Sequence, residues 1–438
     1  MNIVSHIGPG KEGAISAALE SLYKAGGRNQ TWWYIGQEQI KCQSKSAVRH
    51  LPGETIPPQV CDSHHRFCHE FIWPIMHGLP EQVSFNEDDF VLYKSFNSIF
   101  ATQIGRQQSH DPYFVQNYQL ALMPKFLKND GRDSAIFWQI PWPNSVPTEY
   151  LAPVIEIAQA LLAAKAIGFS TKEYADNFNA FVDLHLPFIN QSRSFGHVAQ
   201  VIVTPVGIDL ESWAEKDVEN IVDPLGDLTT PYVLSVDKAE YSMGALTRLQ
   251  AIDLFFENNA NLREKISFVQ IFGRSNPGIK ASDKCWKECQ DTIDDLTQKY
   301  GTANWQPIVT ISQPISSEQL AYLYKNAAVM LVAAVKDGLN LSAKEFIACQ
   351  SNENPGILAI STGVGCTDEF GHYVMTFGPD DAEAIADATV RCLHMPATQK
   401  VRRNLRLLQL LHKNPQQQWC DKFTTALYGG QSAVAEAS

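Results

Sequence analysis

The segment from Val329 to Phe346, VMLVAAVKDGLNLSAKEF, joins a strand pattern, a polar turn and a helix start. Its apolar run ends at Lys336, the turn DGLNL follows, and helical spacing begins near Ser342. The first N–H groups of a helix have no partner inside the helix, and the helix dipole favours negative charge there. The segment therefore predicts an anion site, with Glu345 one turn further in, within reach of a ribose diol. An ordinary strand–turn–helix with an Asp or Asn cap fits the same spacing.

Two groups of cysteine and histidine are weaker signals. One group lies close together in the first hundred residues: Cys61, His64, His65, Cys68 and His69. Zinc sites usually show tighter ligand pairs and a second pair elsewhere, so a helix surface or a ligand contact is favoured over a metal. Cys285 and Cys289, four residues apart, are typical of core or surface thiols. No G-x-S-x-G elbow is present, which disfavours a hydrolase triad.

Alternating strand and helix patterns must position these residues. In the second half, strands are expected over 232–236, 266–272, 308–311, 329–335 and 356–361, and helices over 245–257, 286–300, 317–326 and 343–349. In the first half, strands are expected over 1–7, 31–35, 113–115 and 135–140, and helices over 14–24, 71–76, 90–104 and 120–127. Such alternation predicts an α/β fold with parallel sheets covered on both faces.

The turn Pro205–Gly207 separates the two halves. We expect an N-terminal domain over 1–205, a second domain over 206–410, a helix over 411–428 that returns to the first domain, and a flexible tail over 429–438. Two Rossmann-like domains in tandem predict a ligand cleft at the facing carboxyl ends of their strands.

Composition excludes several classes of protein. Of 438 residues, 45% are hydrophobic and 19% charged, as in globular proteins. The net charge of −12 disfavours a general nucleic-acid-binding surface. The most apolar stretch, 150–169, is interrupted by Glu156 and Lys165, so no membrane span is expected. The opening residues lack a secretory pattern and the nine cysteines mostly occur in apolar or helical contexts, which predicts a cytoplasmic protein.

The segment KDGLNLSAKEFIACQ resembles the nucleotide-sugar motif of the trehalose-6-phosphate synthase family, which includes pseudo-glycosyltransferases. Between Phe71 and Gln350, further segments resemble segments of the family and occur in the same order along the chain. They are FIWPIMHG, SFNEDDFVLYKSFNSIFA, YFVQNYQLALMPKFL, IFWQIPWPNSVPTEYL, LLAAKAIGFSTKEYADNFNAFV, VTPVGIDLESW and the segment that begins YVLSVDKAEYSMG. Of these, LLAAKAIGFSTKEYADNFNAFV is similar to a helix of the family. The resemblance implies a GT-B fold of two Rossmann-like domains facing a central cleft. It also implies retaining transfer of a sugar or pseudo-sugar from a nucleotide diphosphate to a phosphorylated sugar or polyol.

The resemblance implies roles for matching residues of the second domain. Asp337 would contact donor-sugar hydroxyls, and Glu345 would bind the ribose. Backbone N–H groups would contact sugar and diphosphate from Gly338, Leu339, Asn340 and Leu341. Lys238 replaces a family arginine that holds the diphosphate, and Arg274 lies near another family arginine. In the first domain, Gly10 and Gly13 would form a loop near the donor diphosphate.

The first domain departs from the family pattern more strongly. Asn117 replaces the Asp of the family's "HDYHL", and Gln139 replaces the His of its "FxHxPFP". Both amides can bond sugar hydroxyls, but neither titrates near neutral pH. The N-terminal arginine of the family's "SNR" has no counterpart. Tyr118 and Trp73 are expected on the acceptor side, where Phe90 replaces a tryptophan.

The family's retaining transfer is proposed to need no protein nucleophile, because the leaving phosphate accepts the acceptor's proton. On that reading the catalytic residues would be Lys238, Asp337, Gln139 and Asn117, which position substrates and stabilise charge. Met243 stands where the family has a lysine, and one lost charge-assisted contact costs about 2–3 kcal/mol, or roughly 30- to 150-fold.

These departures suggest a non-standard donor or acceptor. The alternative is a catalytically silent paralogue that acts as a regulatory or scaffolding subunit. No metal or cofactor is expected beyond the nucleotide sugar, whose base (UDP, GDP or ADP) stays open. The expected partners are that nucleotide sugar and a phosphorylated sugar or polyol, with no nucleic acid and no membrane. A homo-oligomer is possible.

Overall fold

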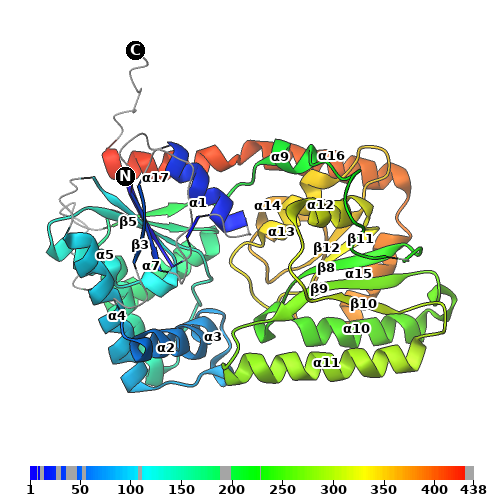
Figure 1. Cartoon of the computed structure of the whole chain (residues 1–438), viewed down its shortest axis with the longest axis horizontal. Helices are drawn as coiled ribbons and strands as arrows, with labels where there is room; N and C mark the ends of the chain where they lie inside the picture. Colours follow the sequence, from blue (N-terminus) through cyan, green and yellow to red (C-terminus); the bar gives the residue numbers. More distant parts are fainter. Residues whose placement is uncertain are drawn as a thin grey trace, which may run out of the picture. The chain divides into compact units, whose positions relative to one another are not determined.

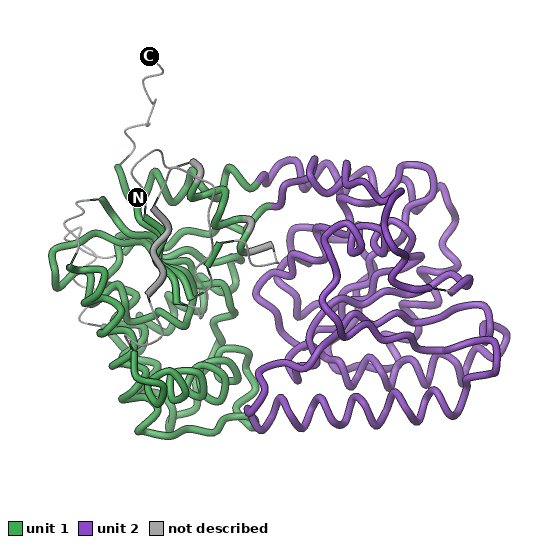
Figure 2. The backbone as a smooth tube through the Cα atoms, in the orientation of Figure 1, with its two compact units in different colours: residues 1–207, 416–438 green, residues 208–415 purple. Residues whose placement is uncertain are grey.

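The computed structural model describes residues 1–6, 8–9, 14–25, 31–35, 47–51, 56–106, 111–187, 199–226 and 228–429. The chain divides into two compact units, residues 1–207 with 416–438 (unit 1) and residues 208–415 (unit 2) (Figure 2). The sequence-based boundaries were 205 and 410. No helix in the described part of the chain has both the length and the apolar content to cross a membrane.

Unit 1 is built on a seven-stranded parallel sheet (Figure 1). Its strands are β1 (Asn2–Ser5), β2 (Thr31–Ile35), β3 (Ala47–Leu51), β4 (Tyr113–Gln116), β5 (Ser134–Trp138), β6 (Ala166–Phe169) and β7 (Gln200–Val203). They are ordered β3-β2-β1-β4-β5-β6-β7. The chain therefore reverses direction across the sheet between β1 and β4, which is the switch point where α/β sheets bind ligands.

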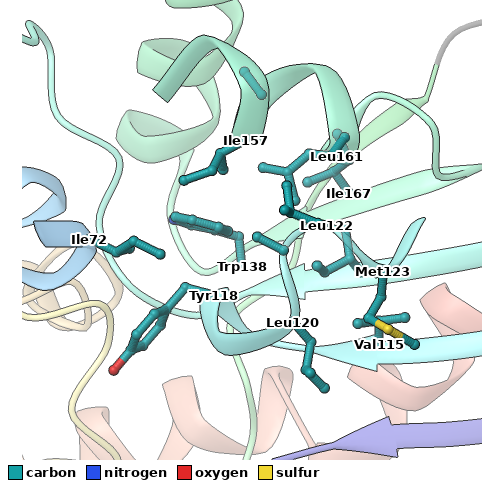
Figure 3. Packing of buried hydrophobic residues seen from close by; sticks show 14 of the residues in the cluster. Ile72, Val115, Tyr118, Leu120, Leu122, Met123, Trp138, Ile157, Leu161 and Ile167 are labelled. Carbon is teal, nitrogen blue, oxygen red and sulfur yellow. The ribbon is translucent and has the colours of Figure 1, made fainter. Parts of the chain in front are cut away.

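Helices cover both faces of this sheet. They are α1 (Ala14–Ala25), α2 (Pro58–Arg66), a π-helix (Phe67–Ile72), α3 (Trp73–Met76), α4 (Glu87–Gly105), α5 (Met123–Asn129), α6 (Leu151–Leu161), α7 (Lys172–His185) and α17 (Gln416–Tyr428). The main core joins one sheet face to the helices from α2 to α7, and Figure 3 shows part of it around Trp138. On the other face, Trp419 and Phe423 of α17 pack edge-on against Phe114 and Phe137.

Unit 2 has a six-stranded parallel sheet, whose strand order reverses in the middle as it does in unit 1. Its strands are β8 (Tyr232–Ala239), β9 (Ser267–Arg274), β10 (Ile308–Ile311), β11 (Val329–Val332), β12 (Ile357–Ser361) and β13 (Met375–Phe377). Their order is β10-β9-β8-β11-β12-β13, the doubly wound order of dinucleotide-binding folds. Its switch point lies between β8 and β11.

The helices of unit 2 form two layers. They are α9 (Leu210–Ala214), α10 (Ala245–Asn258), α11 (Lys280–Tyr300), α12 (Ser317–Asn326), α13 (Leu341–Cys349), α14 (Thr367–Phe370), α15 (Ala382–Leu393) and α16 (Ala397–Lys413). Helices α10, α11 and α15 share a core with the sheet, whereas α12, α13 and α9 pack together on the other face (Figure 1). The expected helix over 411–428 is interrupted: α16 ends at Lys413 and α17 begins at Gln416.

Several elements differ from the sequence-based expectation. Residues 161–182, matched to one family helix, contain β6 between the end of α6 and α7. Strand β11 ends at Val332 rather than Val335, because the N–H of Val335 turns to donate to the carbonyl of Ser242. Helix α11 begins at Lys280, six residues before the expected start at Trp286. Its first turn is anchored by the Ser282 hydroxyl, which donates to Glu240 at 2.9 Å.

Candidate active site

Several of the unit 2 residues expected to bind the donor lie at the switch point between β8 and β11. Lys238 lies near the carboxyl end of β8, and Asp337 follows β11, the strand paired with β8. The loop that contains Met243 contacts the loop after β11, since Ser242 accepts the N–H of Val335 at 2.8 Å. The next loop joins them: Asp337 N donates to Gly363 O at 3.0 Å, and Cys366 N donates to Leu339 O at 3.1 Å. Three strand-end loops thus form one hydrogen-bonded cluster.

Two glycines make this close approach possible. A Cβ on Gly244 would lie 2.0 Å from the carbonyl oxygen of Ala333, and Gly244 has a φ of +64°. A Cβ on Gly363 would lie 2.0 Å from the carbonyl oxygen of Val335. Both contacts are with backbone, which cannot move aside easily. The loop cluster therefore depends on the missing side chains.

Asp337 is held inside its own turn. Its Oδ1 accepts the Leu339 N–H at 3.3 Å, and its Oδ2 accepts the Asn340 side-chain amide at 3.0 Å. Burial raises the pKa of Asp337, against the opposing effect of these donors. The Leu339 N–H, which the resemblance directs at the donor, thus points at a carboxylate, and the Leu339 side chain is buried. The contacts of Asp337 and Leu339 with a donor stay predictions.

Asn340 starts helix α13. It has a φ of +68°, and its side-chain oxygen accepts the N–H of Ala343 at 3.0 Å. Within the described ranges, no acceptor bonds the N–H groups of Leu341 and Ser342. The helix start that the sequence predicted thus has an Asn cap and two unpaired N–H groups, as an anion site requires. The structure thus contains the Asn cap of the ordinary strand–turn–helix alternative, and anion binding at these N–H groups stays a prediction.

Glu345 lies one turn into α13 and is 5% exposed. Tyr324 of α12 donates its hydroxyl to Oε2 at 3.2 Å. Burial raises the pKa of Glu345 to about 7, although Tyr324 and Lys216 oppose the rise. A carboxyl group with this pKa is partly protonated near neutral pH. Its predicted bond to a ribose would stabilise the ionised form.

The cations of this cluster differ in availability. The side chain of Lys238 is exposed, and it has no ion-pair partner in the described segments. Arg274, at the end of β9, instead donates Nε and Nη2 to Oδ1 of Asp283 at 2.9 and 2.7 Å. Met243 is half-buried just before α10. The role of Arg274 at a diphosphate stays a prediction, and it would compete with Asp283.

In unit 1, the structure brings Asn117 and Gln139 together after the paired strands β4 and β5. The Asn117 amide donates to Oε1 of Gln139 at 3.4 Å, and the Gln139 N–H donates to the Asn117 side chain at 3.4 Å. Gln116 also donates to Oε1 of Gln139 at 2.9 Å, while its own buried Oε1 has no hydrogen-bond partner among the described residues. This amide cluster offers donors and an acceptor to hydroxyl groups without a titratable side chain.

The three residues expected on the acceptor side are differently placed. Tyr118 is 2% exposed, and Figure 3 shows its hydroxyl pointing away from Trp138. Trp73, partly buried, lies 6.0 Å from the Tyr118 ring. Phe90 is 5% exposed and stacks on Phe67 at 4.9 Å, so most of its surface belongs to the core. Their acceptor contacts stay predictions. Gly10 and Gly13 lie outside the described residues.

The Cys/His group is not a helix surface as a whole. His64 and Cys68 are 2% and 1% exposed, and the His64 ring stacks on Phe96 and Tyr93. Among the residues that the structure describes, no three His, Cys, Asp or Glu side chains form a metal-binding group. Cys285 and Cys289 are buried core thiols, and Trp138 and Trp142 are also fully buried.

Sequence reasoning missed two buried ion pairs behind the unit 2 loops. Arg248 of α10 pairs with Asp237 and donates Nε to Gln270 at 2.7 Å. Lys344, beside Glu345, pairs with Glu369 at 2.7 Å. The first pair joins α10 to the end of β8, and the second joins α13 to α14. Spacing gave no signal for either pair, because their members lie 11 and 25 residues apart.

Comparison with known proteins identifies the family. Residues 28–429 match the family model described as glycosyltransferase family 20. An Arabidopsis thaliana protein named probable alpha,alpha-trehalose-phosphate synthase [UDP-forming] 4 is 26% identical over 385 residues, covering 83% of this chain and 48% of its own length. The chain thus spans about half the length of the first curated relatives it matches.

Solved structures agree on the fold. An alpha,alpha-trehalose-phosphate synthase (UDP-forming) from Burkholderia xenovorans, in complex with glucose-6-phosphate, has a TM-score of 0.87 at 22% identity and covers 98% of this chain and 100% of its own. An E. coli structure bound with UDP-2-fluoro glucose has a TM-score of 0.86 at 22% identity, with 98% and 99% covered. The fold is therefore GT-B, as the sequence predicted. With the family model matching nearly the whole chain, the protein belongs to glycosyltransferase family 20.

Proposed function

We propose that the chain is a retaining glycosyltransferase. It transfers a sugar or pseudo-sugar from a nucleotide-diphosphate donor to a phosphorylated sugar or polyol. The observation that carries the proposal is the loop cluster of unit 2. There, the first N–H groups of α13 have no acceptor among the residues that the structure describes, and they come after β11 in the chain. Strand β11 pairs with β8, and β8 carries the exposed Lys238. The relatives' names (UDP-forming) and the complexes with a UDP-sugar and glucose-6-phosphate support it.

The roles follow from what each group can do chemically. The N–H groups of Leu341 and Ser342 would bind the diphosphate, and Lys238 would stabilise the charge that grows on it as the sugar leaves. Glu345 would accept a ribose hydroxyl. In unit 1, the amides of Asn117 and Gln139 would orient the acceptor. The acceptor hydroxyl attacks the anomeric carbon, the bond to the diphosphate breaks, and a phosphate oxygen takes the proton.

We further propose that the donor or acceptor is non-standard for the family. The amide pair of Asn117 and Gln139 offers no charge and no titratable proton, and Met243 offers no cation to the diphosphate. These substitutions would change the contacts to both substrates. In unit 1, the side-chain amides of Asn117 and Gln139 can still form hydrogen bonds. We also propose that the enzyme works in the cytoplasm, in keeping with eight free cysteines in the described part of the chain. It would use no metal or other cofactor.

The direct test is a product screen. The full chain is incubated with UDP-, GDP- and ADP-linked sugars, each with a panel of phosphorylated sugars and polyols. Products are detected by mass spectrometry, and the anomeric configuration of each new bond is read by NMR. A product whose new bond keeps the anomeric configuration of the donor supports the proposal. Products with inverted configuration would contradict the retaining mechanism. No product from any pair would favour the second candidate.

That second candidate is a catalytically silent regulatory or scaffolding subunit. Two observations favour it: Met243 replaces a cation, and Arg274 is already paired with Asp283. Of the two cations expected near the diphosphate, Lys238 and Arg274, only Lys238 then has no ion-pair partner among the described residues. Binding of a nucleoside diphosphate without turnover would be the signature of this candidate with its donor site retained.

A further inference from the structure

The turn after β4, which carries Asn117, has an unusual backbone. Asn117 has a φ of +68° and a ψ of 177°, a conformation that residues other than glycine seldom adopt. A single 3-10 turn, Tyr118–Leu120, follows it, closed by the Leu120 N–H donating to Asn117 O at 3.1 Å. Such a conformation persists only where surrounding groups hold it.

Side chains from α2 and α4 hold this turn by its carbonyl groups. Tyr93 donates its hydroxyl to Tyr118 O at 2.6 Å. His64 Nε2 lies 2.8 Å from Gln119 O, and the Asn97 amide donates to the same oxygen at 3.3 Å. The Tyr93 hydroxyl also accepts the Ala121 N–H at 3.3 Å. We call Tyr93, His64 and Asn97 the turn clamp.

The turn clamp is buried and closely packed. Tyr93 and Asn97 are fully buried and His64 is 2% exposed. The His64 ring lies 3.7 Å from the Phe96 centroid and 5.3 Å from the Tyr93 centroid, nearly parallel to both. Each carbonyl also accepts a second, longer hydrogen bond at 3.3 Å, Gln119 O from Asn97 and Tyr118 O from the Ala121 N–H. Removing His64 or Tyr93 therefore takes away the shorter of two donors inside the fold, which is more costly than losing an exposed hydrogen bond.

The chemistry fixes the protonation of His64. A peptide carbonyl only accepts, so Nε2 must carry the proton in this contact. Burial and the neighbouring histidine His6 lower the pKa of His64 well below its ordinary value, so the ring is neutral near pH 7. In the neutral ring Nδ1 then has no proton, and Nε2 is the ring nitrogen that donates.

We propose that His64 and Tyr93 are positioning residues of the transferase. Their hydrogen bonds to Gln119 O and Tyr118 O fix the turn so that Asn117 meets Gln139. The inference rests on the proposed function, because it assigns that amide pair to the acceptor. Neither residue needs to touch substrate. A zinc site or a surface role, weighed from sequence for His64, does not account for its burial against Phe96 or its bond to Gln119.

Two variants separate the hydrogen bond from the packing. In His64→Gln the side-chain N–H reaches the place of Nε2, and in His64→Asn it reaches only the place of Nδ1. Both are polar and both lose the ring. We expect His64→Gln to keep kcat/KM for the acceptor within about threefold of the wild type, and His64→Asn to lose about tenfold or more. Affinity for UDP, bound by unit 2, should stay the same in both.

Amide hydrogen exchange gives a readout that needs no activity. Exchange at Leu120 and Ala121 should quicken about tenfold in His64→Asn and stay near wild type in His64→Gln. Equal exchange and equal turnover in the two variants would overturn the proposal. If the wild type transfers no sugar, the proposed function fails, while exchange still decides the positioning role.

A second substitution guards against misfolding. Should His64→Asn fail to fold, Tyr93→Phe keeps the ring and removes only the hydroxyl that bonds Tyr118 O. Faster exchange at Leu120 with lowered kcat/KM supports the clamp, and unchanged values in both assays refute it.

Discussion

Glu345 makes folding stability depend on pH in a way that one substitution should remove. Its carboxyl group is 5% exposed, and burial raises its pKa from 4.5 to about 7. The folded state therefore prefers the protonated group. As pH rises through 4.5, the unfolded chain ionises while the fold still holds the proton, and the fold loses stability until pH passes 7. Glu345→Gln keeps the shape and an acceptor for the Tyr324 hydroxyl, but never ionises.

The size of the effect follows from the two pKa values. A rise from 4.5 to about 7 corresponds to about 3 kcal/mol once both states are ionised. At pH 5 less than about 1 kcal/mol of this penalty is present, whereas at pH 8 nearly all of it is. Glu345→Gln should thus gain about 2 kcal/mol more at pH 8 than at pH 5. For a unit of this size that is about 4–8 °C in Tm.

The assay is thermal unfolding of the ligand-free full chain at pH 5, 6, 7 and 8, by circular dichroism or calorimetry. Glu257→Gln, at an exposed position, is the matched control and should leave the pH dependence as in the wild type. The two Glu345 curves should converge at pH 5 and separate above pH 6. A Glu345→Gln variant whose Tm follows the wild type at every pH, or that is less stable at pH 8, would refute the reasoning.

Three further predictions concern the loop cluster of unit 2. Lys238→Ala should lower kcat more than it weakens nucleotide binding, by roughly 30- to 150-fold, measured in the transfer assay and by calorimetry; equal losses would indicate ground-state binding instead. Met243→Lys should restore a cation and tighten UDP binding by about tenfold or more in calorimetry, and unchanged affinity would place that side chain away from the diphosphate. Gly244→Ala should cost several kcal/mol, about 3 or more, because its Cβ would meet Ala333 O at 2.0 Å at a φ of +64°. Gly378→Ala, with nothing within 4 Å, should be near neutral in urea unfolding, and similar losses in both would argue against the close approach.

The fold and the places of several site residues followed from sequence because they depend on order along the chain. Asn117 and Gln139 each follow a strand, and neighbouring parallel strands end at one edge, so the two amides meet. The turn chemistry of DGLNL predicted a capped helix that begins near Ser342, and the structure begins it at Leu341 with Asn340 as the cap. Strand β6 was not predicted, because four apolar residues between two helices fit the periodicity of a helix as well as that of a strand.

The details of the site depend on contacts that no spacing encodes. Arg274 meets Asp283 only because α11 begins early, at Lys280. The burial of Glu345 depends on Tyr324 of another helix. The bond of His64 to Gln119 joins residues 55 positions apart. Each is a tertiary contact between two elements. Sequence periodicity can predict each element by itself, but it does not show which elements contact one another.

The central claim is that the loop cluster of unit 2 binds a nucleoside diphosphate at the start of α13. Calorimetric titration of the full chain with UDP, GDP and ADP tests it most directly. The account predicts saturable one-to-one binding of at least one of them, weakening as salt is added because charge drives it. Heats that never saturate with any of the three would contradict the claim.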